Sequence, residues 1–266
     1  MLSEKAKELF ARLDMEYPAV AVKYSYSQPE NTEHVNEELS FCQFVKKAQT
    51  EGRKFFTTKD DDNCSGKVIL GMVPNDPLAA SGIAGVDFGL FRMTAPNARL
   101  HNTYPTLYPG SVNFVTFCPV SICDFDPDLV ICVADNRQAD IIMRATSYIS
   151  GDLWESKVSC AVSCAWMYVY TYLSGKVNYC ITGLHHGMKR RNVYLAGLHI
   201  IAIPYQKLDE VMTALDEMPW VLPAMREDPE SVAGLQAKMD RWHELSPDFL
   251  IKATPHKKCQ ERQDVI

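Results

Sequence analysis

The sequence predicts an α/β or α+β fold in which helices flank a mixed β-sheet. Short apolar segments rich in β-branched residues recur along the chain, and stretches with helical spacing of apolar residues separate them. The composition, with 47% hydrophobic and 23% charged residues, is typical of a globular protein. A chain of 266 residues is long enough to bury a large core in one unit or in two closely packed halves.

Residues 1–16 predict an N-terminal helix that precedes the main domain. Apolar residues form one helical stripe between charged residues, at Ala6, Leu9, Phe10 and Leu13. This pattern is not that of a signal-peptide core. A buried strand is expected at 17–24, because small and β-branched residues follow Pro18.

A helix and two strands are expected next. The helix is indicated by the spacing of Leu39, Phe41, Cys42, Val45 and Ala48. It is expected to end at Gly52, which two basic residues follow. Strands are expected at 55–58 and at 64–72, on either side of an acidic turn.

Residues 74–109 are rich in Pro, Gly and Asn and predict irregular structure with one short helix, as a lid or binding loop. Beyond this segment, strands are expected at 112–117, 129–134, 177–181 and 198–203, and helices at 137–148, 160–173 and 206–215. Residues 182–192 are expected to form a loop. Residues 217–266 predict a helical extension, with an apolar stripe at Val232, Leu235, Met239 and Trp242, and a polar tail.

The chain contains a weak internal repeat. In each copy a helix near a cysteine ends at a glycine, and an apolar strand and a glycine-containing turn follow. The two sets of markers are Cys42, Gly52 and Cys64, and Cys164, Gly175 and Gly187. The repeat divides a domain at 17–216 into two related halves, 17–125 and 126–216.

Charge and hydropathy exclude two kinds of partner. The formal net charge is −6, whereas nucleic-acid binding calls for a clustered excess of Lys and Arg. The longest apolar stretches are shorter than the roughly 20 residues that a membrane span needs. We therefore expect a cytoplasmic protein that binds neither nucleic acid nor membrane.

Several catalytic motifs are absent from the sequence. It has no Walker A loop, GxGxxG, HExxH or GxSxG motif. No short motif therefore supports nucleotide hydrolysis, dinucleotide binding, zincin proteolysis or α/β-hydrolase chemistry. The acidic run at 60–62 lacks the alternating ligands of a calcium loop, and a charged turn is expected there.

Four segments carry a resemblance to a known family. They are FCQFVKKA at 41–48, NCSG at 63–66 with Leu70 and Gly71, LHHGMKRR at 184–191, and HIIAIPY at 199–205. On these segments the chain resembles the DUF169 family over residues 17–216. The resemblance implies a cytoplasmic protein from an archaeon or an anaerobic bacterium, and it implies no particular reaction.

Nine cysteines in a chain without a secretion signal suggest ligands, nucleophiles or small core residues rather than disulfides. The first hypothesis is a metal-binding or iron–sulfur redox protein of anaerobic metabolism, with Cys42, Cys64, Cys118 and Cys164 as ligands. An iron–sulfur cluster requires about four converging thiolates. Cys123 and Cys160 are further candidates, although neither Cys118-x4-Cys123 nor Cys160-x3-Cys164 is a CxxC motif.

The alternative interpretation is that most of these cysteines are small buried hydrophobic residues. Cys132 and Cys180 lie inside apolar strands and favour that role, and Cys259 lies in the polar tail. Cys64 is the best functional candidate because it lies at the end of a loop, and Cys42 is the next because thiols near a helix N-terminus have a lowered pKa.

The second hypothesis is a non-catalytic module that binds a small anionic metabolite. His186, Arg190 and Arg191 in the loop from His185 to Arg191 are its binding residues, because guanidinium groups pair with carboxylate and phosphate in a planar fork. His101 and Asn102 are expected to close over this site. The alternative for the loop is a solvated surface or a contact within a homo-oligomer.

A third hypothesis is an enzyme with Cys64 as its nucleophile. The sequence pairs no base with this thiol, so it does not decide whether the protein is an enzyme. It also does not identify a redox partner or a substrate.

Overall fold

The computed structural model describes residues 2–222, 225–226 and 228–244. The chain separates into two compact units, Met1–Met218 and Pro219–Ile266. The described part of the second unit contains helix α11 (Pro229–Glu244). None of the helices in the described residues combines the length and apolar character that a membrane span requires.

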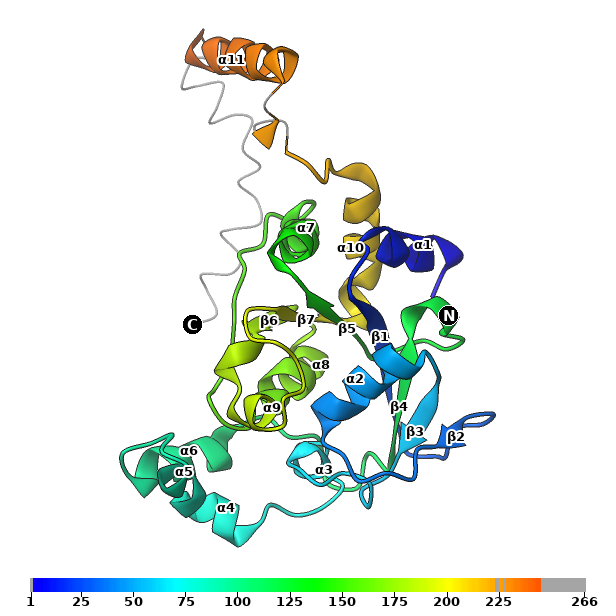
Figure 1. Ribbon diagram of the computed structural model, residues 1–266, viewed down its shortest axis with the longest axis vertical. Coiled ribbons are helices and arrows are strands. Elements are labelled where there is room, and N and C mark those ends of the chain that lie inside the picture. The colour runs from blue at the N-terminus through cyan, green and yellow to red at the C-terminus, as the bar shows by residue number, and fades with distance from the viewer. Residues whose placement is uncertain (1, 223–224, 227, 245–266) are drawn as a thin grey trace, which may run out of the picture. The chain divides into compact units, whose positions relative to one another are not determined.

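The first unit is built on a seven-stranded mixed sheet with the order β2-β3-β4-β1-β5-β7-β6 (Figure 1). Its strands are β1 (Tyr17–Ser25), β2 (Glu33–His34), β3 (Phe55–Thr57), β4 (Phe114–Pro119), β5 (Leu129–Ala134), β6 (Asn178–Ile181) and β7 (His199–Pro204). Only the β2–β3 pair among these strands is parallel. This confirms the α/β class with a mixed sheet.

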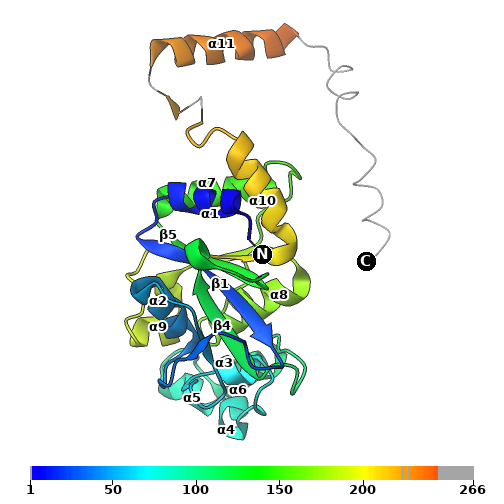
Figure 2. The same ribbon diagram turned by 90° about the vertical axis from the view of Figure 1, so that its right-hand side faces the viewer.

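Helices cover both faces of the sheet (Figure 2). One face packs against α1 (Glu4–Arg12), α7 (Asn136–Ser147) and α10 (Tyr205–Glu217). The other packs against α2 (Phe41–Glu51), a π-helix (Ala165–Tyr170) and α8 (Thr171–Ser174). The remaining helices are α3 (Gly66–Ile69), α4 (Pro77–Ser81), α5 (Ile83–Asp87), α6 (Thr94–Thr103), α9 (His186–Arg190) and the short 3-10 helices Val120–Ile122 and Thr182–Leu184.

Strand alternation divides the buried residues between the two faces. Val20 and Val22 of β1 join the core that contains Phe44 of α2 and Phe117 of β4. Residues between them point to the opposite face, which α1, α7 and α10 cover. Because both faces are covered, every residue of β5 is buried. Its apolar composition, LVICVA, follows from this position.

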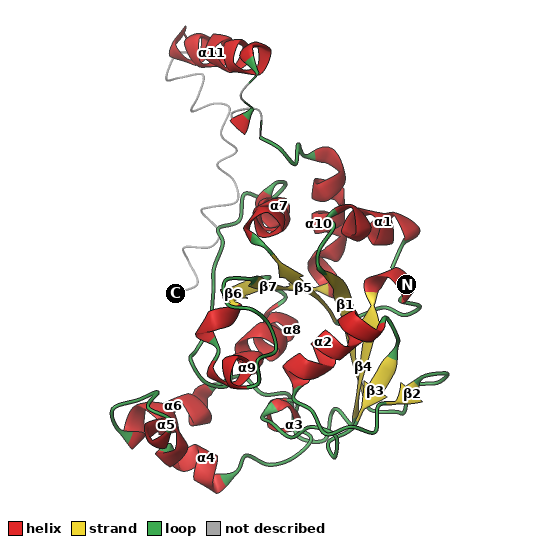
Figure 3. Cartoon of the chain, viewed as in Figure 1, coloured by secondary structure: helices red, strands yellow, loops and turns green. Residues whose placement is uncertain are grey.

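The expected strand at 64–72 is wrong, because residues 66–69 form helix α3 (Figure 3). Backbone N–H groups here bond to carbonyls three or four residues earlier instead of to a neighbouring strand. The apolar run Val68–Leu70 fits either conformation, because it is too short for its periodicity to distinguish them. The segment 74–109 also contains more helix than expected, namely α4, α5 and α6.

The predicted repeat of two halves stays a prediction. Six of the seven strands are nevertheless arranged symmetrically about the β1–β5 pair, since β1, β4 and β3 follow one another outward as β5, β7 and β6 do on the other side, whereas β2 has no counterpart. The helices before β3 and β6 end at Gly52 and Gly175, both in the left-handed conformation that glycine adopts most readily.

Replacing Phe117 with Ala is expected to destabilise the first unit by about 3–5 kcal/mol. Phe117 is fully buried and its ring lies 5.0–5.7 Å from the rings of Phe41, Phe44 and Phe55, so the change leaves a cavity at the centre of the core. The free energy of unfolding from urea titrations measures this loss. Tyr26→Ala is the control, because Tyr26 is 69% exposed and its loss is expected to cost under about 0.5 kcal/mol. Equal losses of unfolding free energy in the two variants would contradict the placement of Phe117 at the centre of the core.

Candidate functional site

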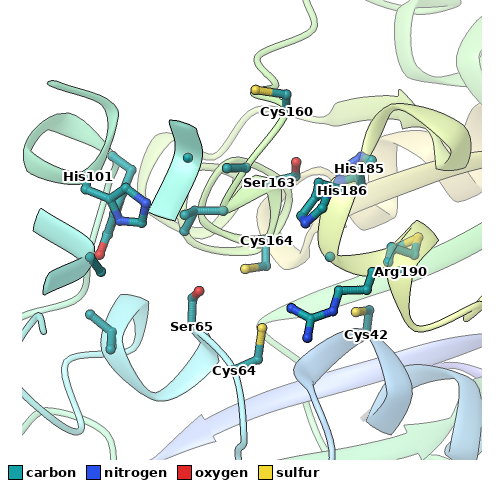
Figure 4. A pocket seen from close by; sticks show the side chains of 18 of the residues that line it. Cys42, Cys64, Ser65, His101, Cys160, Ser163, Cys164, His185, His186 and Arg190 are labelled. Carbon is teal, nitrogen blue, oxygen red and sulfur yellow. The ribbon is translucent and has the colours of Figure 1, made fainter. Parts of the chain in front are cut away.

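Residues from distant parts of the chain surround a cavity of about 500 Å³ (Figure 4). Its thiols are Cys42, Cys64, Cys160 and Cys164. Its basic and imidazole side chains are Lys67, His101, His185, His186, Arg190 and Arg191. The rest of the wall is largely apolar and includes Val68, Tyr104 and Met167. The volume is that of a small-molecule site rather than of a single ion.

The start of α2 holds Cys42 in the cavity wall. The Oε1 atom of Gln43 accepts hydrogen bonds from the backbone N–H of Ser40 at 3.0 Å and from its hydroxyl at 2.8 Å. The hydroxyl oxygen of Ser40 also lies 3.4 Å from the sulfur of Cys42. The side chains of Ser40 and Gln43 therefore fix the first turn of the helix and the Cys42 thiol within it.

A backbone bridge places Cys64 beside this helix start. The N–H of Leu39 donates to the carbonyl of Asp61 at 2.9 Å, and the N–H of Asn63 donates to the carbonyl of Leu39 at 3.0 Å. The carboxylate of Asp62 accepts from the N–H of Cys64 at 2.6 Å. Gly66 is required here, because a Cβ at this position would lie 1.9 Å from an oxygen of Asp62.

Cys164 comes from the second half of the chain and precedes the π-helix. Short π-helical segments are frequently found at functional sites in proteins. Val162, two residues earlier, has a φ of +53°, which is a strained conformation for a β-branched residue. Tyr168 of the π-helix stacks on Phe41 of α2 with ring centroids 4.3 Å apart. This contact holds the segment that carries Cys164 against the helix that carries Cys42.

Cys42, Cys64 and Cys164 come from three separate segments and line the same cavity, and we call them the thiol triad. Burial, with a smaller contribution from Cys64, raises the pKa of Cys42 to about 11 against the lowering effect of the hydrogen bond with Ser40, so the lowered pKa expected at a helix N-terminus is wrong. Burial likewise raises the pKa of Cys164 well above its ordinary value, with additional contributions from Cys64 and Cys42. Each of the three pairs is therefore close enough to interact electrostatically. Cys42 and Cys164 are neutral thiols near pH 7 unless a cation replaces their protons.

The other predicted ligand, Cys118, does not line the cavity. It follows Phe117 in β4, so alternation turns it to the face that α1 covers, where its charge would act on Lys7. A hydrogen bond to Cys123, together with burial, raises the pKa of the Cys118 thiol. Cys160 lines the cavity instead. Cys259 lies outside the described residues.

The predicted anion-binding residues lie in the same cavity as the triad. His186 and Arg190 are in α9, and Arg191 follows it. The ring of Phe88 stacks on His186 at 5.2 Å, and the guanidinium of Arg190 lies over the same ring at 5.5 Å. In the part of the chain that the structure describes, neither arginine forms an ion pair with a carboxylate.

Three polar residues of the site were missed in the sequence. Asp62 belongs to an acidic run that predicts a charged turn, yet it is 6% exposed, and burial raises its pKa to about 6. Asp62 does not itself line the cavity but holds the neighbouring Cys64, whereas Lys67 and Asn97 line it, and no sequence pattern distinguishes these two residues. The segment 74–109, expected as a lid or binding loop, contributes His101 to the wall, whereas Asn102 bonds to the carbonyls of Ala80 and Ala98.

His185 forms a buried pair with Cys180 of β6. Its Nε2 atom lies 2.6 Å from the sulfur, and both residues are at most 5% exposed. Burial raises the pKa of Cys180 to about 12 and lowers the pKa of His185 to about 4. The pair is therefore neutral near pH 7, unlike the thiolate–imidazolium pair of a cysteine nucleophile.

Fold and cavity together define a mixed α/β protein with a cavity lined by thiols and basic side chains. The chain belongs to the DUF169 family, whose model, described as Uncharacterised ArCR, matches residues 8–214. The match includes all residues of the cavity wall. No curated protein and no solved structure matched the chain.

Stability is expected to fall in acid because of His185. Its pKa is about 4 in the fold and about 6.5 in the unfolded chain, so its contribution is complete above pH 6.5 and is lost as the pH falls towards 4. Relative to His185→Gln, the wild type is expected to lose on the order of 3 kcal/mol of unfolding free energy between pH 7 and pH 4. Urea titrations across this range measure the difference.

His199→Gln is the matched control, because His199 is a partly exposed histidine outside the cavity wall. Its unfolding free energy is expected to follow that of the wild type across the pH range. If the curves for His185→Gln and the wild type run parallel, the buried neutral imidazole is ruled out.

Proposed function

We propose that the protein binds an iron–sulfur cluster in the cavity through Cys42, Cys64 and Cys164, and that it has a redox role in anaerobic metabolism. The observation that carries this proposal is the thiol triad, in which three cysteines from three separate segments line one cavity and influence one another's pKa. Soft thiolates are the ligands that such clusters require. The fourth donor is either Cys160, which lines the same cavity, or a ligand that enters it.

The electrostatics of the cavity support an anionic metal group. Cys42 and Cys164 must lose protons to bind iron, and the resulting negative charge faces Lys67, Arg190 and Arg191. Among the described residues, no three His, Cys, Asp or Glu side chains are grouped closely enough to hold a single metal ion.

The proposal places the protein in a reducing compartment such as the cytoplasm. All eight described cysteines are free thiols. Thiolate ligands persist where disulfides are kept reduced.

Anaerobic reconstitution with iron and sulfide is expected to load the wild type with about four irons per chain. Each of Cys42→Ala, Cys64→Ala and Cys164→Ala is expected to lose most of this iron and its visible absorbance, because each removes one ligand. Iron and sulfide analysis with the absorption spectrum measures the loss. If Cys160 is the fourth donor, Cys160→Ala is expected to lose iron as the triad variants do. If the fourth donor is a ligand that enters the cavity, this variant is expected to keep its iron.

Cys118→Ala is the matched control, since it removes a buried thiol on the opposite face of the sheet. This variant is expected to bind as much iron as the wild type. A wild type that stays colourless and free of iron, or a control that loses as much iron as the triad variants, would rule out the cluster.

A second function, binding of a small anionic metabolite, is favoured by the basic side of the cavity. Lys67, Arg190 and Arg191 line the cavity together with one acidic residue, Asp76. Asp62, which does not line it, is a buried carboxyl whose pKa is raised to about 6. The cavity therefore carries an excess of cationic groups. Guanidinium groups in such a setting bind carboxylate or phosphate in pairs of hydrogen bonds.

Replacing both Arg190 and Arg191 with Ala is expected to abolish the thermal stabilisation by phosphorylated or carboxylated metabolites. The reason is the loss of the paired donors and of two charges. A thermal-shift screen of such metabolites measures the effect. Lys189→Ala is the control, because this cation lies in the same helix but does not line the cavity. A wild type that no anion stabilises would contradict this function.

A further inference from the structure

Two polar atoms at the α6 side of the cavity have no hydrogen-bond partner among the described residues. They are Oδ1 of Asn97 and Nδ1 of His101, and both atoms are buried. Both side chains line the cavity. Buried polar groups in proteins are almost always paired, so two unpaired atoms beside one cavity indicate where a ligand binds.

The structure fixes the orientation of the Asn97 amide. Asn97 is 1% exposed, and its Nδ2 atom donates to the carbonyl of Gly82 at 3.0 Å. Gly85 packs tightly against the amide, because a Cβ at Gly85 would lie 2.3 Å from the amide carbon of Asn97. The amide nitrogen is thereby engaged, and Oδ1 remains as a hydrogen-bond acceptor.

His101 provides a second polar atom near this acceptor. Its backbone carbonyl accepts from the side chain of Asn75 at 3.1 Å, and its ring packs edge-on against Tyr104 at 5.8 Å. Burial lowers the pKa of His101, so its imidazole is neutral near pH 7 and offers one donor and one acceptor nitrogen. A neutral acceptor and a neutral imidazole suit a hydroxyl or an amide group of a ligand.

The two polar ends of the cavity lie apart. Figure 4 shows the ring of His101 at one end and the side chain of Arg190 at the other, with Cys64 and Cys164 between them and Cys42 at the Arg190 end. We propose that the ligand is an organic anion that carries a hydroxyl or amide group, with the anionic group bound by Arg190 and Arg191 and the uncharged group bound by Asn97 and His101. This inference rests on the anion-binding function proposed above.

Calorimetric titrations with matched pairs of probes test this assignment. The pairs are malate and succinate, glycerol 3-phosphate and propyl phosphate, and 4-hydroxybenzoate and benzoate. In at least one pair the hydroxylated member is expected to bind the wild type about tenfold more tightly, because it pairs the two buried polar atoms. His101→Phe keeps an aromatic ring at this position, and it is expected to reduce the ratio of the two affinities from about ten to about one.

Asn97→Ala gives an independent check, and thermal unfolding of both variants verifies that they are folded. Equal affinity for both members of every pair would overturn this inference and leave the anion site standing. A preference that persists in both variants would overturn the assignment to Asn97 and His101. If the wild type binds no probe, both this inference and the anion site fail.

Discussion

The stacking of Tyr168 on Phe41 is the contact on which the arrangement of the cavity depends. It joins the helix start that carries Cys42 to the π-helix that Cys164 precedes, although the two aromatic residues are far apart in the sequence. Phe41 also contacts Phe117 at the centre of the sheet, so the stack is anchored in the main core. The cavity wall is therefore as rigid as the core behind it.

The same arrangement explains why Cys42 and Cys164 stay neutral when no metal group is bound. Cys42 and Cys164 are placed where burial disfavours the thiolate, so a lone charge there is unfavourable. Under the proposed function, a cationic metal group would displace the protons of these thiols, and the arginines of the cavity would compensate the remaining negative charge. His185 of the cavity wall forms a buried neutral pair with Cys180, and its pKa of about 4 makes this pair a source of pH-dependent stability.

The sequence predicted the strands well because both faces of the sheet are covered. Runs such as 129–134 are continuously apolar for that reason, and β5 has the predicted bounds. The segment at 66–69 could not be assigned in the same way, since a short apolar run fits a buried helix as well as a strand. The helices between 77 and 103 bury few residues, so they leave little periodic signal.

For the site, the sequence identified residue types but not their positions in space. It named Cys42, Cys64 and Cys164, which line one cavity, together with Cys118, which alternation turns to the opposite face. That distinction depends on strand register. Asn97 carries no sequence signal at all, because its role as an acceptor depends on its contacts with Gly82 and Gly85.

Diffraction at the iron absorption edge, from crystals of the anaerobically reconstituted protein, tests the central claim most directly. We expect anomalous density from a multi-iron group in contact with the sulfurs of Cys42, Cys64 and Cys164. Crystals of reconstituted protein in which the three sulfurs point away from one another, with no iron density between them, would contradict it.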